Sequence, residues 1–269
     1  MSDYRIIDPP GLAGTRTLLV DGQGNADYNT IQAAIDAAAA VATANERWQV
    51  RVAPGVYAEN VVMADYVDLV GLAPGRAALI KPASGVALVG NVDATLANLM
   101  LASTNDAVIE TEARVTSPEW HLYNIIIDQT VQYHNIRHGG GKLHLWGCLI
   151  AGGGPIELEA AGSYLYAYHS VMRNKATSGS GHKVILVTHG SMWLYGCLVE
   201  NTASAGYGIY IANTPGTLKA LHTTIRRANS TYSVTADLSC NFYMNGCVAN
   251  AAIDSNVSGA NDVVVDGGA

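Results

Sequence analysis

The segment LHLWGCLI at residues 143–150 decides the fold, because the same motif returns as MWLYGCLV at 192–199 and as FYMNGCVA at 242–249. Weaker copies occupy residues 122–127, 167–172 and 220–225. Aligning the copies on one position gives Gly71, Asn98, Asn124, Gly147, His169, Gly196, His222 and Gly246, in steps of 22 to 27 residues. A repeat of this period is typical of a solenoid. Each copy alternates in the way a strand does and lacks helical periodicity.

These observations predict an all-β fold, a right-handed parallel β-helix of about eight coils. From residue 86 onward we expect two clear strands per coil: the motif itself and a second apolar stretch before a Gly turn. The first of these second stretches is residues 107–113, and the last is residues 261–269. Because the repeat continues from about residue 66 to the C-terminus, residues 17–269 are predicted to form a single domain.

The N-terminal residues are different. Residues 1–16 contain Pro-Pro and several glycines but no period, and we expect an arm outside the solenoid. Residues 28–43 are predicted to form a helix that covers the open N-terminal end of the core. Asn29 or Thr30 is expected to cap its first turn. Its apolar stripe is Ile31, Ala34, Ile35 and Ala38.

Composition excludes several classes of partner. The net charge is −7 and only 14% of the residues are charged, which disfavours nucleic-acid binding because that requires clustered Lys and Arg. No run of 18 apolar residues occurs, so we expect no membrane partner. The opening MSDYRIIDPPG lacks the apolar region of a secretory signal.

Three of the four cysteines share one position of the repeat. Cys148, Cys197 and Cys247 recur in every second coil, with Ser170 and Thr223 between them. Sulfurs two strands apart are separated by roughly 10 Å, whereas a disulfide needs Cα atoms within about 7 Å. We therefore expect reduced core cysteines. For the fourth cysteine, Cys240, the sequence does not settle whether the thiol is free. No metal ion or other cofactor is expected, since Cys-X-X-Cys and His-Glu-X-X-His spacings do not occur.

The outer face of the motif strand carries the candidate binding site. Side chains alternate along a strand, so Leu143 and Leu145 are expected inside while His144 and Trp146 point out. The same register gives two outward columns: Tyr123, Trp146, Tyr168, Tyr195, Leu221 and Asn245, and beside it His121, His144, Tyr166, Trp193, Lys219 and Tyr243. The candidate site comprises His121, Tyr123, His144, Trp146, Tyr166, Tyr168, Trp193 and Tyr195.

Three interpretations of these columns remain open. Stacked rings stabilise adjacent strands by about 0.2–1 kcal/mol per pair, which needs no ligand. Exposed aromatic surface is also typical of a protein interface. Finally, sugar rings can lie on aromatic faces, which would make the sheet a carbohydrate platform.

Residues 19–82 carry a more specific signal. This segment reads DGQGNADYNTIQAAIDAA, followed by VRVAPGVYAENVVM and then by VDLVGLAPGRAALIKP. It resembles the N-terminal segment of pectin methylesterases and of the wider pectin-lyase-like β-helix superfamily. The resemblance implies the fold. Those enzymes need two carboxylates, an arginine and two glutamines facing one groove. The nearest string is Asp128-Gln129-Thr130, with the order reversed, and no Asp-Phe-X-Phe-Gly follows. We therefore assign no catalytic residue.

Other charged residues are expected to be structural. Glu157 and Glu159 share one face of a strand and are interpreted as a solvated edge. Asp106, Glu110 and Glu112, together with Arg137 and His138 of the next coil, form either a salt-bridge stack or an active groove. A basic stripe is expected from Arg173, Lys175, Arg226 and Arg227.

The resulting functional hypothesis is a non-enzymatic structural or adhesive component of a phage-like virion. Phage tailspikes and decoration proteins use this fold, usually as trimers, so a homotrimer is expected, with residues 1–16 anchoring it to a capsid or tail protein. The alternatives are a polysaccharide-active enzyme of the pectinesterase or lyase kind, and a carbohydrate-binding module without turnover. The location would then be extracellular, without a recognisable signal.

Overall fold

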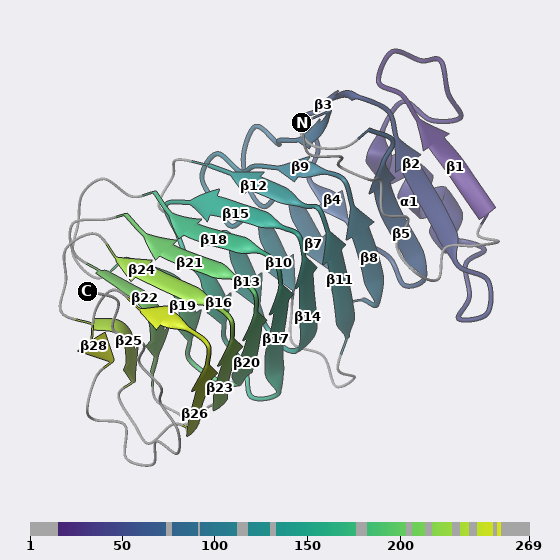
Figure 1. Cartoon of the computed structure of the whole chain (residues 1–269). Helices are drawn as coiled ribbons and strands as arrows, with labels where there is room; N and C mark the ends of the chain where they lie inside the picture. Colours follow the sequence, from purple (N-terminus) through teal and green to yellow (C-terminus); the bar gives the residue numbers. More distant parts are fainter. Residues whose placement is uncertain are drawn as a thin grey trace.

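The computed structural model describes residues 16–253, apart from the short segments 74–76, 91, 112–117, 130–132, 176–181, 203–205, 213–216, 228–231, 237–240 and 250–251. Three parallel sheets wind around one core to form an elongated solenoid (Figure 1). Among the described residues the sheets contain 10, 9 and 9 strands, slightly different from the eight coils expected. The prediction of an all-β parallel β-helix is confirmed.

Each sheet takes one strand from each successive coil. Sheet 1 contains β1 (Arg16–Val20), β2 (Trp48–Val52), β5 (Val67–Gly71), β8 (Ala94–Ala97), β11 (Glu119–Tyr123), β14 (Gly141–Trp146), β17 (Ser163–Tyr168), β20 (Ser191–Tyr195), β23 (Thr217–Leu221) and β26 (Asn241–Asn245). Sheet 2 contains β3 (Gly55–Tyr57), β6 (Ala78–Ile80), β9 (Met100–Leu101), β12 (Ile126–Asp128), β15 (Leu149–Gly152), β18 (Val171–Asn174), β21 (Leu198–Asn201), β24 (Thr224–Arg227) and β27 (Val248–Ala249). Sheet 3 contains β4 (Val61–Val62), β7 (Leu88–Gly90), β10 (Ile109–Thr111), β13 (Ile136–His138), β16 (Ile156–Leu158), β19 (His182–Val187), β22 (Gly206–Ile211), β25 (Tyr232–Ala236) and β28 (Ala252–Ile253).

The expectation of two strands per coil was wrong, because the repeated motif bends in its middle. LHLWGCLI lies partly in β14 and partly in β15, and Gly147 stands between the two strands. The aligned positions from Asn98 to Gly246 all have positive φ, between 48° and 62°. Glycine adopts this conformation freely, and Asn and His tolerate it better than most residues do. The repeat position is therefore a left-handed bend that turns the chain from sheet 1 into sheet 2.

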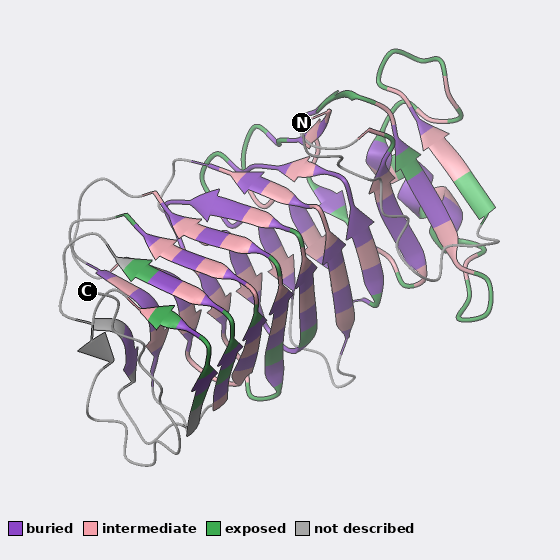
Figure 2. Cartoon of the chain, in the orientation of Figure 1, coloured by how far each residue is buried: buried purple, intermediate pink, exposed green. Residues whose placement is uncertain are grey.

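The core follows the predicted alternation. Leu143 and Leu145 are fully buried, and Figure 2 shows buried and partly exposed residues alternating along the strands. Cys148, Cys197 and Cys247 are buried and free. Desolvation raises the pKa of the Cys148 thiol to about 12 and also raises the pKa of the Cys197 thiol. Cys240 and the final stretch 261–269 lie outside the described residues.

The N-terminal helix α1 (Ile31–Ala39) is shorter than the expected 28–43. Tyr28 pairs with Val20 as an isolated bridge, so the helix begins only after Thr30, whose side chain accepts a hydrogen bond from Ala33 N. At the other end, an isolated bridge between Thr43 and Glu46 returns the chain to β2. The helix cannot include Tyr28 or Thr43, because their backbone N–H groups donate to Leu19 O and Glu46 O instead of to a helical carbonyl.

Helix α1 lies at the N-terminal end of the solenoid beside β1 and β2 (Figure 1). Its predicted apolar stripe is buried: Ile31, Ala34, Ile35 and Ala38. The carboxylate of Glu59, from the PGVYAE turn, accepts hydrogen bonds from the backbone N–H groups of Ile31 and Gln32, both at 3.0 Å. The turn and the helix start are thus one unit. In the described part of the chain no helix has the length and apolarity to cross a membrane.

The boundary of the expected arm shifts by one residue. Arg16 is the first residue of β1 and pairs with Trp48 of β2. The rest of the predicted arm, residues 1–15, lies outside the described residues.

Candidate functional site

The two outward columns of sheet 1 have the register that the sequence predicts. Tyr123, Trp146, Tyr168 and Tyr195 are paired in succession across β11, β14, β17 and β20. The second column pairs in the same way through His121, His144, Tyr166 and Trp193. All eight candidate residues therefore lie on one outer face. We call this set the aromatic ladder.

The rings of the ladder stack on one another rather than lying flat on the sheet. Tyr123 and Trp146 have ring centroids 4.6 Å apart with planes 7° apart. Tyr166 and Trp193 are likewise 4.6 Å apart at 9°, and His144 and Tyr166 are 4.8 Å apart at 10°. Parallel rings at this spacing cover one another's faces, so mainly ring edges reach solvent. A sugar ring stacks on an exposed aromatic face, and few aromatic faces are exposed in the middle of the ladder.

The regular stack ends at Tyr195. Its ring is tilted by 40° from that of Tyr168, with centroids 6.4 Å apart. It meets His169 edge-on at 6.0 Å and His222 edge-on at 6.2 Å. Tyr195 is 43% exposed, more than any other member of the ladder. The C-terminal end of the ladder thus presents an aromatic ring that is not enclosed between two parallel neighbours.

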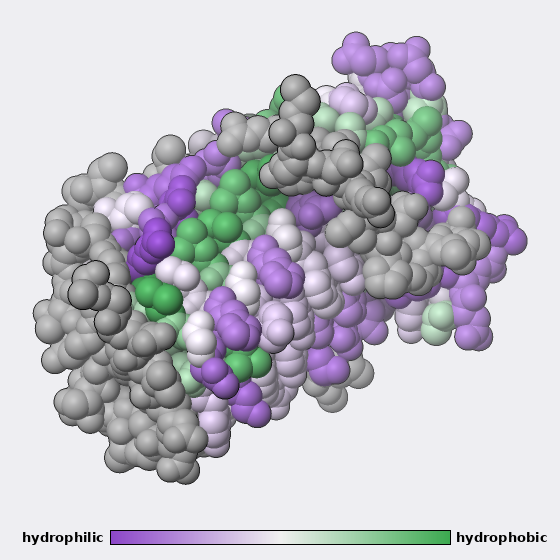
Figure 3. All heavy atoms as spheres, viewed as in Figure 1, coloured by the Kyte–Doolittle hydropathy of each residue, from purple (hydrophilic) through white to green (hydrophobic). Residues whose placement is uncertain are grey.

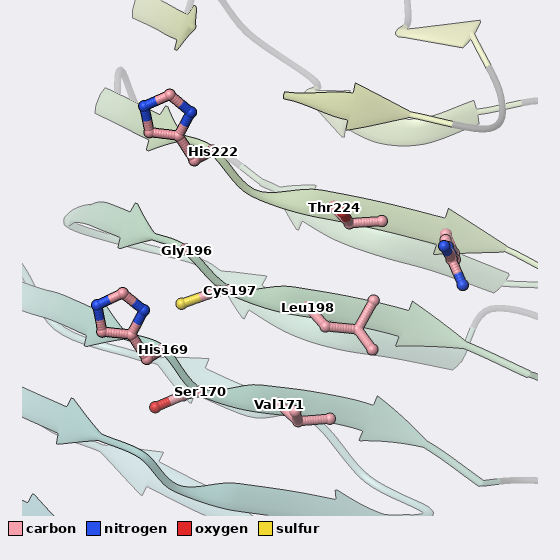
Figure 4. A pocket seen from close by; sticks show the side chains of 9 residues that line it. His169, Ser170, Val171, Gly196, Cys197, Leu198, His222 and Thr224 are labelled. Carbon is pink, nitrogen blue, oxygen red and sulfur yellow. The ribbon is translucent and has the colours of Figure 1, made fainter. Parts of the chain in front are cut away.

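A hollow of about 330 Å³ opens beside Tyr195, on the bend between sheets 1 and 2. Figure 4 shows the imidazoles of His169 and His222 on the same side of the bend, with Gly196 between them and Val171, Leu198 and Thr224 further along the strands. Gly196 has no side chain, so a gap is left between the two imidazoles. The remaining lining residues are Ser170, Cys197 and Arg226.

The lining of the hollow suits binding better than bond cleavage. Its polar groups are the two imidazoles, the Thr224 hydroxyl and the guanidinium of the exposed Arg226. None of its lining residues carries a carboxylate. Ser170 Oγ donates to the carbonyl of Tyr168 at 3.0 Å, and Cys197 Sγ donates to the carbonyl of Ala167 at 3.3 Å. Neither group faces the hollow as a free nucleophile.

Sheet 2 carries an apolar column that the sequence analysis missed. Its outward positions are Val56, Leu79, Met100, Ile126, Leu149, Val171, Leu198, Thr224 and Val248, each paired with the next. All are half-buried or exposed. Figure 3 shows the resulting hydrophobic band over the strands of sheet 2. The signal was present in the sequence, since the residues from Met100 to Val248 each stand two places after a bend position, but the motif was interpreted as one strand.

Next to this column, two of the four residues expected to form a solvated basic stripe are held in ion pairs, while Arg226 is exposed as expected. Arg173 Nε lies 2.6 Å from Glu200 Oε2, and Lys175 Nζ lies 2.8 Å from Asp128 Oδ1. The side chain of Arg227 is not described. Asp128 is therefore engaged by a lysine. Its neighbour Gln129 is buried, with its amide donating to Asn135 Oδ1 at 3.2 Å.

On sheet 3 the acidic cluster forms a salt-bridge stack. Arg137 bridges Glu110 and Glu159, with N–O distances of 3.0 Å to each. Glu157 instead pairs with His134. Asp106 Oδ1 accepts the backbone N–H of Ala107 at 2.8 Å.

His138 does not belong to that outer cluster. It is fully buried between Thr111 Oγ1 at 2.8 Å and the carbonyl of Gly141 at 3.0 Å, and desolvation lowers its pKa. Its expected place in that cluster was wrong, because inward positions on β13 face the core. Glu112 lies outside the described residues.

At its N-terminal end the ladder meets a carboxylate. Glu119 Oε1 lies 2.9 Å from His144 Nε2 and 3.6 Å from His121 Nε2. Desolvation is the main cause that lowers the pKa of His144 to about 4, and it lowers the pKa of His121 as well. Lys142 and the histidines lower the pKa of Glu119 against the effect of its own burial. Both imidazoles are consequently neutral at pH 7.

Comparison with known proteins identifies the fold. No protein-family model and no curated protein matches the sequence. Among solved structures, pectin methylesterase from carrot superimposes with a TM-score of 0.66 at 15% identity, over 92% of this chain and 86% of that one. The enzyme from Aspergillus niger gives 0.68 at 12%, over 93% of both chains. Pectin methylesterase PemA from Erwinia chrysanthemi gives 0.63 at 13%, over 91% and 93%. The fold is that of the pectin-lyase-like β-helices, as the resemblance of residues 19–82 implied.

Proposed function

We propose that this chain binds a polysaccharide at the hollow beside Tyr195, without turning it over. The observation that carries the proposal is the break in the ring stack, which leaves Tyr195 exposed next to a hollow lined by hydrogen-bonding groups. An exposed ring supplies the apolar contact that one face of a sugar needs. The imidazoles of His169 and His222 and the guanidinium of Arg226 supply donors for its hydroxyl groups.

The fold supports this class of ligand. The similar structures are pectin methylesterases, and one of them is described in complex with a hexasaccharide, at 12% identity and a TM-score of 0.64. A long parallel sheet gives an extended chain a straight surface on which successive units can lie.

Turnover is left out of the proposal for a chemical reason. Ester or glycoside hydrolysis in these folds needs carboxylates free to attack, to accept protons or to donate them. Glu110 and Glu159 are both held by Arg137, and Asp128 is held by Lys175. Changing Asp128 or Arg137 to Ala should therefore leave binding intact. Loss of a measured turnover in either variant would overturn the non-catalytic assignment.

The test is a calorimetric titration of the purified chain with a panel of neutral and acidic polysaccharides, which measures the affinity for each. Tyr195→Ala and Arg226→Ala should each weaken binding at least about tenfold, equivalent to about 1.4 kcal/mol. Tyr133→Ala is the matched control, because Tyr133 is similarly exposed, at 48%, but lies elsewhere. Equal affinity in Tyr195→Ala and Tyr133→Ala would remove the hollow as the site.

A second candidate function rests on the apolar column of sheet 2. Contiguous exposed apolar surface on a soluble protein usually marks association. We infer that this band is covered by further copies of the chain, in the homotrimer that the resemblance to phage tailspikes led us to expect. Mass measurement in solution tests it: the wild type should be trimeric and Val171→Glu monomeric. A monomeric wild type at high concentration would contradict it. Attachment through residues 1–16 and a virion location stay predictions.

A further inference from the structure

Glu119, His121 and His144 bring one carboxylate and two imidazoles together on the outer face of sheet 1. They belong to β11 and β14, which lie side by side (Figure 1). We propose that these three side chains form a binding site for a borderline divalent metal ion, with Zn²⁺ as the first choice. Imidazole nitrogen and carboxylate oxygen are ordinary ligands of such ions, and a set of two histidines and one carboxylate leaves a coordination position for water.

The spacing of the ligand atoms fits a tetrahedral ion. Ligand atoms held about 2.0–2.1 Å from Zn²⁺ in a tetrahedron are separated from one another by about 3.3–3.4 Å. Glu119 Oε1 lies 2.9 Å from His144 Nε2 and 3.6 Å from His121 Nε2, values on either side of that separation. All three ligand atoms lie within 4.8 Å of one another. The ion would therefore enter between atoms that the fold already gathers.

The imidazoles also have unused hydrogen-bonding atoms. Both ring nitrogens of His144 and Nδ1 of His121 are buried and make no hydrogen bond in the structure. The contact between Glu119 and His144 is close, but it is not aligned as a hydrogen bond. Burying His144 Nε2 without a hydrogen bond costs free energy, which coordination of a metal ion at this atom would recover.

One adjustment is required. The rings of His121 and His144 are stacked 4.7 Å apart with planes 16° apart, so their in-plane lone pairs run nearly parallel. A shared ion needs them to converge. His121 can tilt more readily than His144, because its partner on the N-terminal side is Thr95, which has no ring. His144 stays held on its other side by Tyr166.

The neighbouring charges partly compete with a metal ion. Lys142 Nζ lies 3.4 Å from Glu119 Oε2, which is the carboxylate oxygen that faces away from the histidines. Arg47 lies close enough to His121 to lower the pKa of that imidazole. Asp93 favours a cation, and its Oδ1 accepts the backbone N–H of Glu119 at 2.7 Å. Removing the competing ammonium in Lys142→Met should therefore strengthen metal binding.

The experiment is calorimetric titration of the chelator-stripped chain with Zn²⁺, with Co²⁺ absorption to report the coordination geometry. We expect one saturable ion per chain, d–d bands typical of four-coordinate Co²⁺, and a higher melting temperature with Zn²⁺. Glu119→Gln and His144→Phe should each bind Zn²⁺ at least about tenfold more weakly, and His144→Phe keeps a ring in the stack. His121→Gln, at the end of the stack, serves as a third variant.

His222→Asn is the matched control. It removes an exposed histidine from a left-handed bend, where Asn98 and Asn124 show that asparagine is accepted. Its affinity for Zn²⁺ should equal that of the wild type. The proposal is overturned if the wild type shows no saturable binding, or if Glu119→Gln and His144→Phe bind Zn²⁺ as tightly as the wild type does.

Discussion

Tyr195 meets His169 edge-on, with ring centroids 6.0 Å apart and an angle of 86° between the planes. The same contact recurs with His222, one coil further on, at 82°. Elsewhere in the ladder neighbouring coils mostly stack their rings in parallel. The change from parallel to perpendicular rings coincides with Gly196, which separates the two imidazoles and leaves the hollow open. Several consequences of this arrangement and of the core can be measured.

Gly196→Ala should destabilise the fold by about 1–2 kcal/mol, because a side chain at positive φ is strained. The φ of Gly196 is +62°, and an added Cβ would lie 2.7 Å from His169 Nδ1. Gly162→Ala separates the two effects: its φ is +81°, but no atom lies within 4 Å of the added Cβ. Urea unfolding should show a larger loss for Gly196→Ala. Equal losses would mean that His169 moves aside without cost.

Asp68→Ala should cost about 3 kcal/mol or more, since it removes one partner of a buried ion pair. The carboxylate of Asp68 is fully buried, pairs with Arg47 and accepts the backbone N–H of Thr95 at 2.9 Å. Glu46→Ala is the comparison, because Glu46 pairs with Arg16 at the surface and should contribute less than about 1 kcal/mol. Denaturant titration of both variants decides the matter. A similar small loss in each would show that Arg47 finds water easily.

Cys148 should resist alkylation in the native protein. Only the thiolate reacts, and burial raises the pKa of this thiol to about 12, so almost none is ionised at pH 8. Incubation with iodoacetamide followed by peptide mass mapping should find Cys148 unmodified before unfolding and modified after it. Rapid modification of the native chain would mean that the coil opens, and would contradict the closed core described here.

Stability should fall as the pH drops from 6.5 to about 4, with His144 as one cause. Desolvation lowers the pKa of its imidazole from 6.5 to about 4 in the folded state. In this window the unfolded chain binds the proton and the folded chain does not, so acid favours unfolding. Above pH 6.5 the neutral His144 makes its full contribution to the free energy of unfolding.

The variant His144→Phe tests this assignment. It should reduce the pH slope of the unfolding free energy in this window, by at most about 1.4 kcal/mol per pH unit. His121 and His138 also have lowered pKa values, so a smaller slope should remain. Thermal melts of the wild type and of His144→Phe at pH 7.5 and pH 5 measure this pH dependence of stability. An unchanged slope in His144→Phe would contradict the assignment.

The sequence alone predicted which residues share a column. From the spacing of the motif, Trp146 was expected beside Tyr168, and Cys148 was expected two coils from Cys197. Strand pairing confirms both expectations. In a parallel solenoid the register follows directly from the period, because each coil must bury the same positions.

Local rules were less reliable where the backbone bends. The motif was interpreted as one strand, although Gly147 and its equivalents turn the chain between two sheets. That error hid the apolar column of sheet 2, which includes Leu149 and Val171. Likewise, the alanine-rich run after Ile31 predicted a longer helix, because helix propensity carries no information about the bridge between Thr43 and Glu46.

What the sequence determined, then, is the repeat, its register and the side chains on the two faces of sheet 1, since a period and an alternation are enough to fix these. Only the tertiary structure decided how those side chains are turned: that ring faces are covered along most of the ladder, that Tyr195 stands open, and that Glu119 lies against His144, 25 positions further along the chain. Ring orientation and contacts between coils depend on torsion angles and neighbours, and a linear pattern does not encode them.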